Sequence, residues 1–397
     1  MSGRRLMIVV PSASSFLAFL REVAAAWIHS GGTVDVAAGP ELRGVIDAWP
    51  ADVNRLALPD FRAGSPSGLA RATFALRTAI LDRKPAIVHA HFSMAVVLAA
   101  ATKQITNGRG RTWLGTFHGM HLSHPSDARS RALGYAEAWA ARRLSAVCVL
   151  NTEDAEALAR HVSAHRIRTV PGFGVGCDLD ACSSSVVPVD HRGLIRTRLG
   201  IPEDAFVVAY VGRRTSFKGF ATAVRGFRQA NLPASRLLLV GLPDVAHRSG
   251  LRPEEHVELE RDTRVIDVGW QEDVPAVLAA ADVCVLPSQR EGVPVTLMEA
   301  LAVGTPVITI NSRGCRDVVR DGVDGIILPS STADSLSTCL TRLKENPSEL
   351  ASLSSAAIAG RSRFDRRRFV TGELKWYDSF DPPACHNAPK EIYECAS

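Results

Sequence analysis

The 397-residue sequence has no apolar run long enough to cross a membrane. A helical span needs roughly 20 consecutive apolar residues. The longest near-continuous run, Met94–Ala101, has eight. The first run, Leu6–Val10, ends at Pro11 after five residues, which is too short for the core of an export signal and predicts a β-strand. We therefore expect a cytoplasmic protein.

Patterns typical of metal sites and disulfide frameworks are also missing. The eight cysteines include no CxxC pair, and Cys148 and Cys284 lie in apolar runs, where a thiol is usually a small buried hydrophobe. The net charge is only +5, from 46 Lys and Arg against 41 Asp and Glu. This excess is too small to indicate nucleic-acid binding, but it suits a phosphate-bearing substrate or an anionic membrane surface. We expect neither a metal ion nor a cofactor.

What the sequence does contain is a regular alternation of short apolar runs and helical patterns. Apolar residues make up 46% and charged residues 22% of the chain, as in globular proteins. The alternation predicts an α/β fold with two doubly wound parallel sheets. The expected strands are Leu6–Val10, Val34–Ala38, Arg55–Leu58, Ala86–Ala90, Thr112–Phe117, Ala146–Leu150, Ile167–Val170, Phe206–Val211, Arg236–Val240, Val265–Val268, Val283–Leu286, Val307–Ile310 and Gly325–Leu328. The clearest helical patterns in the first half are Phe16–His29, Leu69–Arg83 and Arg129–Arg143.

A segment rich in Gly, Ser and Pro, Gly172–Arg192, interrupts this alternation and predicts a linker. We expect a first domain at residues 1–185, a second at 186–365, and a C-terminal segment at 366–397 that starts as a basic helix and ends frayed. Ligands of such sheets bind at the carboxyl ends of the strands. The chemistry should therefore lie in the loops after the strands, in the cleft between the domains.

The strongest motif follows an expected strand in the second half, PSQREGVPVTLMEALAVGTPV. Glu291 lies in the loop, and Glu299 follows after seven residues, in the first turns of a helix expected to begin near Thr296. A helix N-terminus attracts anions, and carboxylates beside it can accept hydrogen bonds from a ribose or a sugar. Either glutamate alone would more often be a solvated or dipole-stabilising residue, but the complete strand–loop–helix pattern favours a ligand site.

A second motif places two cations after another strand. Gly212 ends the strand, and Arg213 and Lys218 follow five residues apart, a pair that can neutralise a diphosphate. The Walker pattern is absent. Arg214 is expected to be a solvated loop cation.

Histidines mark a strand end in the first half. His118 follows the expected strand Thr112–Phe117 and should project into the cleft. His89 and His91 fit core hydrogen bonding and cleft lining equally well. His121 and His124 have no carboxylate or cysteine at ligand spacing, so we expect no metal there. The Asp178-Leu-Asp180 pair lies in the linker and predicts a solvated turn.

These motifs resemble the retaining glycosyltransferases of family 4, most closely the bacterial branch that builds capsular polysaccharide, exopolysaccharide or O-antigen. The resemblance extends from Arg5 to about Tyr377. It implies the glycosyltransferase B fold, in which two Rossmann-like domains face a cleft and a C-terminal helix, here Arg366–Tyr377, crosses back to the first domain. It also implies a nucleotide-sugar donor, commonly UDP-linked, that is bound without a metal.

The resemblance also implies roles for individual residues. Arg213 and Lys218 would hold the diphosphate, Glu299 the ribose and Glu291 the donor sugar. His118 would face the reacting sugar, so the catalytic set is His118, Glu291, Arg213 and Lys218. The implied donor-binding set is Gly212, Arg213, Lys218, Gly269, Trp270, Glu291, Gly292, Val293, Pro294, Val295 and Glu299.

The acceptor site departs from the family pattern. A Gly-Gly pair is common after the first strand, whereas this chain has Pro11–Ser15 there. Ser12, Ser14, Ser15 and His91 are the expected acceptor contacts. The family's acceptors are lipid-linked or oligosaccharides, and Arg129–Arg143 is either a helix that contacts an anionic membrane or an ordinary amphipathic helix. A non-catalytic nucleotide-sugar sensor or scaffold is the alternative function.

Overall fold

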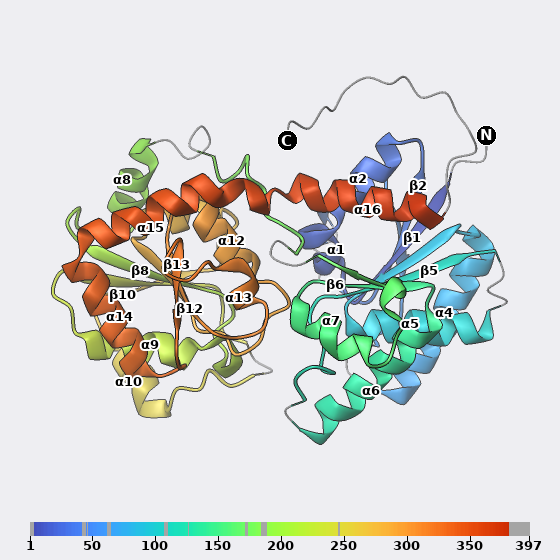
Figure 1. Ribbon diagram of the computed structural model, residues 1–397, viewed down its shortest axis with the longest axis horizontal. Helices are drawn as coiled ribbons and strands as arrows, with labels where there is room; N and C mark the ends of the chain where they lie inside the picture. Colours follow the sequence, from blue (N-terminus) through green and yellow to red (C-terminus); the bar gives the residue numbers. More distant parts are fainter. Residues whose placement is uncertain are drawn as a thin grey trace.

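A computed structural model describes residues 4–41, 45, 47–61, 65–106, 110–125, 127–170, 174–183, 189–244 and 247–380. It contains two parallel sheets, one in each half of the chain (Figure 1). The seven-stranded sheet has the order β3-β2-β1-β4-β5-β6-β7, and the six-stranded sheet the order β10-β9-β8-β11-β12-β13. The predicted fold, two doubly wound α/β domains, is confirmed.

The five inner strands of the first sheet are almost entirely buried and rich in apolar residues, whereas the edge strands β3 and β7 are partly exposed. Helices cover both faces of this sheet (Figure 1). The strands are β1 (Arg5–Val10), β2 (Thr33–Ala38), β3 (Asn54–Ala57), β4 (Ile87–His91), β5 (Thr112–Phe117), β6 (Ala146–Val149) and β7 (Ile167–Thr169). The main helices are α1 (Ala13–Phe19), α2 (Arg21–His29), α4 (Pro66–Arg83), α5 (Ser93–Ile105), α6 (Ala128–Arg143) and α7 (Thr152–Ala159).

The second domain repeats this arrangement. Its strands are β8 (Phe206–Val211), β9 (Ser235–Val240), β10 (Val265–Gly269), β11 (Val283–Leu286), β12 (Val307–Ile310) and β13 (Gly325–Leu328). Its helices are α8 (Val189–Arg198), α9 (Phe220–Ala230), α10 (Pro253–Arg261), α11 (Val274–Ala280), α12 (Val295–Ala302), α13 (Cys315–Val318), α14 (Ala333–Glu345) and α15 (Pro347–Gly360). No helix within the described ranges has the length and apolar character needed to cross a bilayer.

The last helix, α16 (Arg366–Phe380), returns to the first domain and packs along α2 (Figure 1). Phe369 and Tyr377 are buried in the first domain's core. Two ion pairs secure the helix, Arg366 to Glu22 at 3.0 Å and Glu373 to Arg168 at 2.5 Å. The predicted crossing helix is thus confirmed, while the expected frayed end from residue 381 lies outside the described residues.

Two expectations about element bounds were wrong. The single helix predicted at Phe16–His29 is two helices, because Leu20 leaves helical geometry (φ −130°, ψ −3°) between α1 and α2. The predicted linker Gly172–Arg192 overlaps α8, which begins at Val189. Arg192 anchors this helix by an ion pair to Asp282 at 2.6 Å. The predicted domain border at residues 185 and 186 falls outside the described residues.

Candidate active site

The loops after β5 and β11 meet between the two domains. His118 and Gly119 follow β5, and Glu291 and Gly292 lie in the loop after β11. A Cβ atom on Gly292 would lie 2.1 Å from the carbonyl oxygen of His118, so only glycine permits this approach. The structure thus joins two of the predicted site motifs from opposite halves of the sequence.

The His118 side chain is half-buried and ordered by aromatic contacts. Its ring stacks on Phe92, with centroids 4.0 Å apart and planes 16° from parallel. Its Nε2 lies 3.2 Å from Nδ1 of His91. Burial lowers the pKa of His118 to about 3, so the imidazole is neutral at physiological pH. A neutral imidazole can donate or accept a hydrogen bond with a sugar hydroxyl without adding positive charge to the site.

Phe92 reaches this position through an uncommon backbone conformation. Its φ of +73° is in the left-handed region, which an aromatic residue rarely adopts. The amide of Phe92 donates to the carbonyl of Thr116 at 2.9 Å, which holds the turn between β4 and α5 against β5. Such conformations concentrate at functional sites, and nothing in the sequence pattern indicates this one.

Glu291 is paired with Lys218. The ammonium Nζ lies 2.5 Å from Oε1, and the side chains of Lys218 and Glu291 are only 21% and 10% exposed. Lys218 ends a short 3-10 turn (Ser216–Lys218) after β8. The neighbouring backbone amide of Gln289 donates to the carbonyl of Phe217 at 2.8 Å, which fixes the two loops together. Two residues implied to contact the donor are therefore in direct contact with each other.

Arg213 borders a pocket of about 520 Å³ at the ends of β8, β9 and β10. Gly212 and Trp270 also line it, and Gly269 has a φ of +68°, which turns the chain after β10. Arg213 is 57% exposed and pairs with Asp244 at 2.6 Å. The size of this pocket is within the range of small-molecule sites, and its lining includes Gly212, Arg213 and Trp270 of the predicted donor set but not Lys218.

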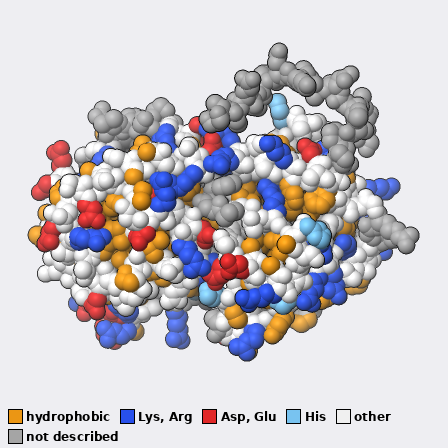
Figure 2. Space-filling model, viewed as in Figure 1, with side chains coloured by type: hydrophobic (Ala, Val, Ile, Leu, Met, Phe, Trp, Pro, Cys, Tyr) orange, Lys and Arg blue, Asp and Glu red, His pale blue; other side chains and the backbone are white. Residues whose placement is uncertain are grey.

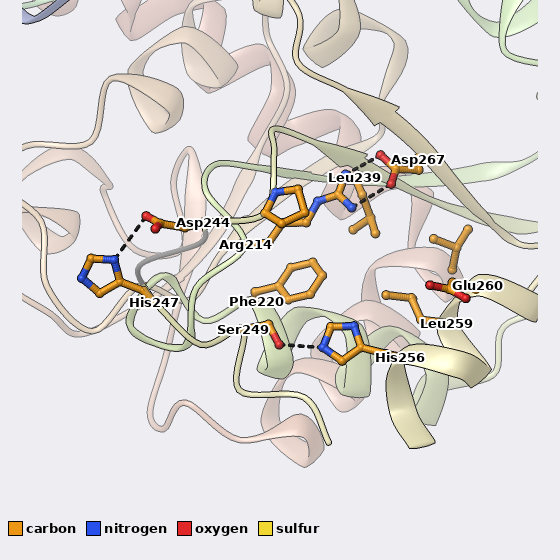
Figure 3. A pocket seen from close by; sticks show the side chains of 12 residues that line it. Arg214, Phe220, Leu239, Asp244, His247, Ser249, His256, Leu259, Glu260 and Asp267 are labelled. Carbon is orange, nitrogen blue, oxygen red and sulfur yellow. Dashed lines mark hydrogen bonds and ion pairs between the residues drawn. The ribbon is translucent and has the colours of Figure 1, made fainter. Parts of the chain in front are cut away.

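Arg214 lines a different pocket from Arg213, and the prediction that it is a solvated cation was wrong, since its side chain is only 11% exposed. Its guanidinium forms two hydrogen bonds to the carboxylate of Asp267. Figure 3 shows this pair on the wall of a second pocket, of about 600 Å³, around Phe220. Asp244 belongs to both pockets and there pairs with His247 at 3.2 Å.

Glu299 is the fifth residue of α12. Burial raises the pKa of its carboxyl group to about 7, an effect that nearby Arg366 partly offsets. Pro294 is the N-cap of the helix, Val295 its first residue, and Val293 packs close to Gly174. The predicted strand–loop–helix geometry is therefore present, with both glutamates on the segment between β11 and the middle of α12.

The expected acceptor serines form a separate group at the start of α1. Ser12 is the N-cap and accepts from the amide of Ser15 at 3.3 Å. Ser14 donates to a carboxylate oxygen of Glu41 at 2.6 Å. The contact from α1 to the His118 region is made by Phe19, whose ring lies 5.9 Å from the imidazole. The hydroxyl of Ser12 therefore caps α1, while those of Ser14 and Ser15 bond to Glu41 and Ser12.

The two histidines of β4 have different surroundings. His89 is a core residue whose ring nitrogens lie 2.8 Å from the hydroxyls of Tyr377 and Thr116. His91 is buried beneath His118. Burial lowers the pKa of both His89 and His91 well below the ordinary value. Within the described residues, His89, His91 and Glu373 are the group whose ligand atoms could converge on a metal, and Glu373 is held there by Arg168.

Two further histidines have carboxylate partners that the sequence pattern did not indicate. His121 lies 3.2 Å from Glu137, and His124 lies 2.7 Å from Glu153. These carboxylates come from α6 and α7, 16 and 29 residues further along the chain. Spacing along the chain therefore could not reveal them.

Comparisons with known proteins identify the family. A model of the glycosyl transferase 4-like domain matches residues 18–172, and the model named glycosyl transferases group 1 matches residues 192–359. The chain is 28% identical over 269 residues to the Escherichia coli UDP-Gal:α-D-GlcNAc-diphosphoundecaprenol α-1,3-galactosyltransferase, covering 66% of each chain. It is 25% identical over 300 residues to the Bacillus subtilis putative glycosyltransferase EpsD, covering 74% of this chain and 76% of that one.

Solved structures show the same fold. Anabaena HepE in complex with UDP superimposes with a TM-score of 0.77 at 20% identity, over 94% of this chain and 100% of that one. Sucrose-phosphate synthase from Thermosynechococcus elongatus superimposes with a TM-score of 0.79 at 20% identity, over 95% of this chain and 99% of that one. The two matched models, together with the joined His118 and Glu291 loops, place this chain among the group 1, or family 4, retaining glycosyltransferases of the GT-B fold.

Proposed function

We propose that this glycosyltransferase transfers a hexose from a UDP-sugar to a hydroxyl group of a lipid-linked or oligosaccharide acceptor, in the synthesis of a bacterial cell-surface polysaccharide. The observation that carries the proposal is the pairing of Lys218 with Glu291 directly beside the His118 loop. The E. coli relative's name specifies a UDP-linked donor and a diphosphoundecaprenol acceptor, and HepE has a structure with UDP.

On the donor side, the base is assigned to the pocket beside Trp270, and the diphosphate to Arg213 and Lys218. An arginine fork and an ammonium group both bind phosphate oxygens by charge-assisted hydrogen bonds. Glu299 is assigned to the ribose diol, because a carboxylate can accept hydrogen bonds from both hydroxyl groups. The positive end of α12 adds to the charge that favours the diphosphate.

Glu291 and His118 are assigned to the transferred sugar. The bond from the anomeric carbon to the diphosphate oxygen breaks, and the acceptor oxygen bonds to the same face of that carbon. The acceptor's proton passes to the departing diphosphate oxygen. Arg213 and Lys218 stabilise the charge on the diphosphate, and Glu291 accepts a hydrogen bond from a sugar hydroxyl while its charge stabilises the cationic ring.

We assign the outer face of α6 to contact with an anionic membrane. The helix buries residues such as Gly134, Glu137 and Ala138, whereas Tyr135 is 65% exposed and Arg129 and Arg131 are also exposed. Figure 2 shows Lys and Arg side chains gathered on the first domain where Figure 1 places α6. Exposed cations beside aromatic groups suit an interfacial helix.

The test of the donor assignment is a panel of nucleotide sugars scored by thermal shift and then by turnover. A ligand that binds the native state raises the melting temperature. We expect UDP and a UDP-hexose to stabilise the protein more than GDP-, ADP- or CMP-linked sugars. Slow hydrolysis of the stabilising donor is expected without an acceptor, and donor binding without hydrolysis or transfer would instead identify a sensor.

A further inference from the structure

Arg313, on the loop between β12 and α13, crosses from the second domain into the first and is only 4% exposed. Its Nη1 atom lies 3.0 Å from Oδ1 of Asp154 in α7 and 2.6 Å from the hydroxyl of Ser123. The same nitrogen donates to the carbonyl of Met120, two residues beyond His118. One guanidinium therefore holds three groups around the loop that follows β5.

The other side of Arg313 holds Glu291. Its Nε donates to the carbonyl of Glu291 at 3.1 Å, and the amide of Glu291 donates to the carbonyl of Arg313 at 3.2 Å. The following residue, Gly314, has a φ of +77°, and a Cβ atom there would lie 2.5 Å from the carbonyl oxygen of Gly292. The backbone of Glu291 is thus bonded on both sides by one residue.

The first domain completes this junction. Asp154 is fully buried and also accepts from the amide of Met120 at 3.1 Å and from the side-chain amide of Asn151 at 2.8 Å. Asn151 donates in addition to the carbonyl of Gly292 at 3.2 Å. Burying a charged pair is costly unless further hydrogen bonds satisfy it, and here Met120 and Ser123 of the loop after β5, together with Asn151, supply those bonds to Asp154.

We propose that Arg313 is a positioning residue for sugar transfer: its guanidinium fixes the backbone of Glu291 against the His118 loop, so that the reacting groups are aligned only while the two domains are joined through Asp154. This inference rests on the proposed function of Glu291 and His118. It assigns Arg313 no contact with the donor. Its effect should therefore fall on the rate of transfer and not on nucleotide affinity.

A second arginine, Arg316 of α13, provides a control. Arg316 also crosses between the domains and pairs with Glu153, but its side chain is 41% exposed. Exposed ion pairs contribute little to the stability of a protein. In the described residues, Arg316 forms no hydrogen bond to the His118 loop or to the Glu291 loop. Loss of Arg316 removes an interdomain ion pair while leaving the alignment of the reacting loops intact.

The experiment compares R313K and R316A with the wild type. Lysine retains a charge for Asp154 but cannot also bond the carbonyl of Glu291. We expect R313K to lower kcat by about tenfold or more, since small displacements of reacting groups have large rate effects. Its UDP dissociation constant, measured by calorimetry, should stay within about threefold of the wild type, and R316A should keep kcat within about twofold.

Three outcomes would overturn the inference. The first is an R313K variant with near-native kcat. The second is an equal loss of UDP affinity and kcat, which would place the effect in the nucleotide site. The third is an equal loss of kcat in R316A, which would make general domain contact sufficient. Melting curves by circular dichroism check that each variant is folded. Absence of turnover in the wild type with every donor would instead refute the proposed function.

Discussion

The ammonium nitrogen of Lys218 lies 2.5 Å from a carboxylate oxygen of Glu291, which joins the loop after β8 to the loop after β11. Each group neutralises the other where both are largely withdrawn from water. A donor diphosphate that binds the ammonium group would release the carboxylate to accept a hydrogen bond from the sugar. Donor binding and the freeing of Glu291 are thus expected to be one event.

The two glutamates of the motif should respond differently to replacement by glutamine. Glu299 is assigned to the ribose, which is bound alike in the ground and transition states, so E299Q should raise donor KM with a smaller effect on kcat. Glu291 is assigned to the reacting sugar, so E291Q should lower kcat by roughly 10²-fold. Steady-state kinetics test both, with circular dichroism as the folding control. Near-native kcat in E291Q would remove Glu291 from the reaction.

Glu299 should also make stability depend on pH. Burial raises its pKa to about 7 in the folded protein, against about 4.3 in an unfolded chain. Between these values the folded state binds more protons, so this group lowers the free energy of unfolding as pH rises towards 7. E299Q should therefore melt at a higher temperature than the wild type at pH 8 and at a similar one at pH 4.5. A difference that does not vary with pH would contradict the raised pKa.

Activity should not require a divalent cation. The diphosphate charge is assigned to Arg213, Lys218 and the N-terminus of α12. Assays in excess EDTA should therefore give the rate measured in untreated buffer. Loss of activity in EDTA that Mg²⁺ or Mn²⁺ restores would contradict this assignment.

Membrane contact through α6 can be tested with anionic vesicles at low salt. The double variant R129E/R131E should bind them more weakly than the wild type, because these cations are exposed on the helix. R198E/R261E changes two exposed arginines of the second domain and should bind like the wild type. Equal binding by all three proteins, or no binding by the wild type, would leave α6 as an ordinary amphipathic helix.

The strands were predicted accurately because buried parallel strands are nearly continuous runs of apolar residues. The predicted bounds of Thr112–Phe117, Phe206–Val211 and Val283–Leu286 are those observed. Expectations failed where no local residue type marks the boundary of an element. The break at Leu20 has no local breaker residue, and Arg192 in the first turn of α8 pairs with Asp282, 90 residues away.

The site was predictable to the extent that its chemistry is local. Glu291 and Glu299 follow the end of one strand, and Arg213 and Lys218 follow the end of another. The spacing within each pair indicates a place where an anion can bind. The supporting groups were not predictable in this way. Arg313 meets Asp154 across 159 residues, and the role of Phe92 depends on a backbone angle that sequence periodicity does not report.

The most direct test is single-turnover transfer from a radiolabelled UDP-hexose to a diphosphoundecaprenol-linked sugar, with the anomeric configuration of the product read by NMR. We predict that the label enters the organic-soluble product, that its configuration matches the donor's, and that E291Q forms little product while still binding UDP. Inversion of configuration, or transfer by E291Q at the wild-type rate, would contradict this prediction.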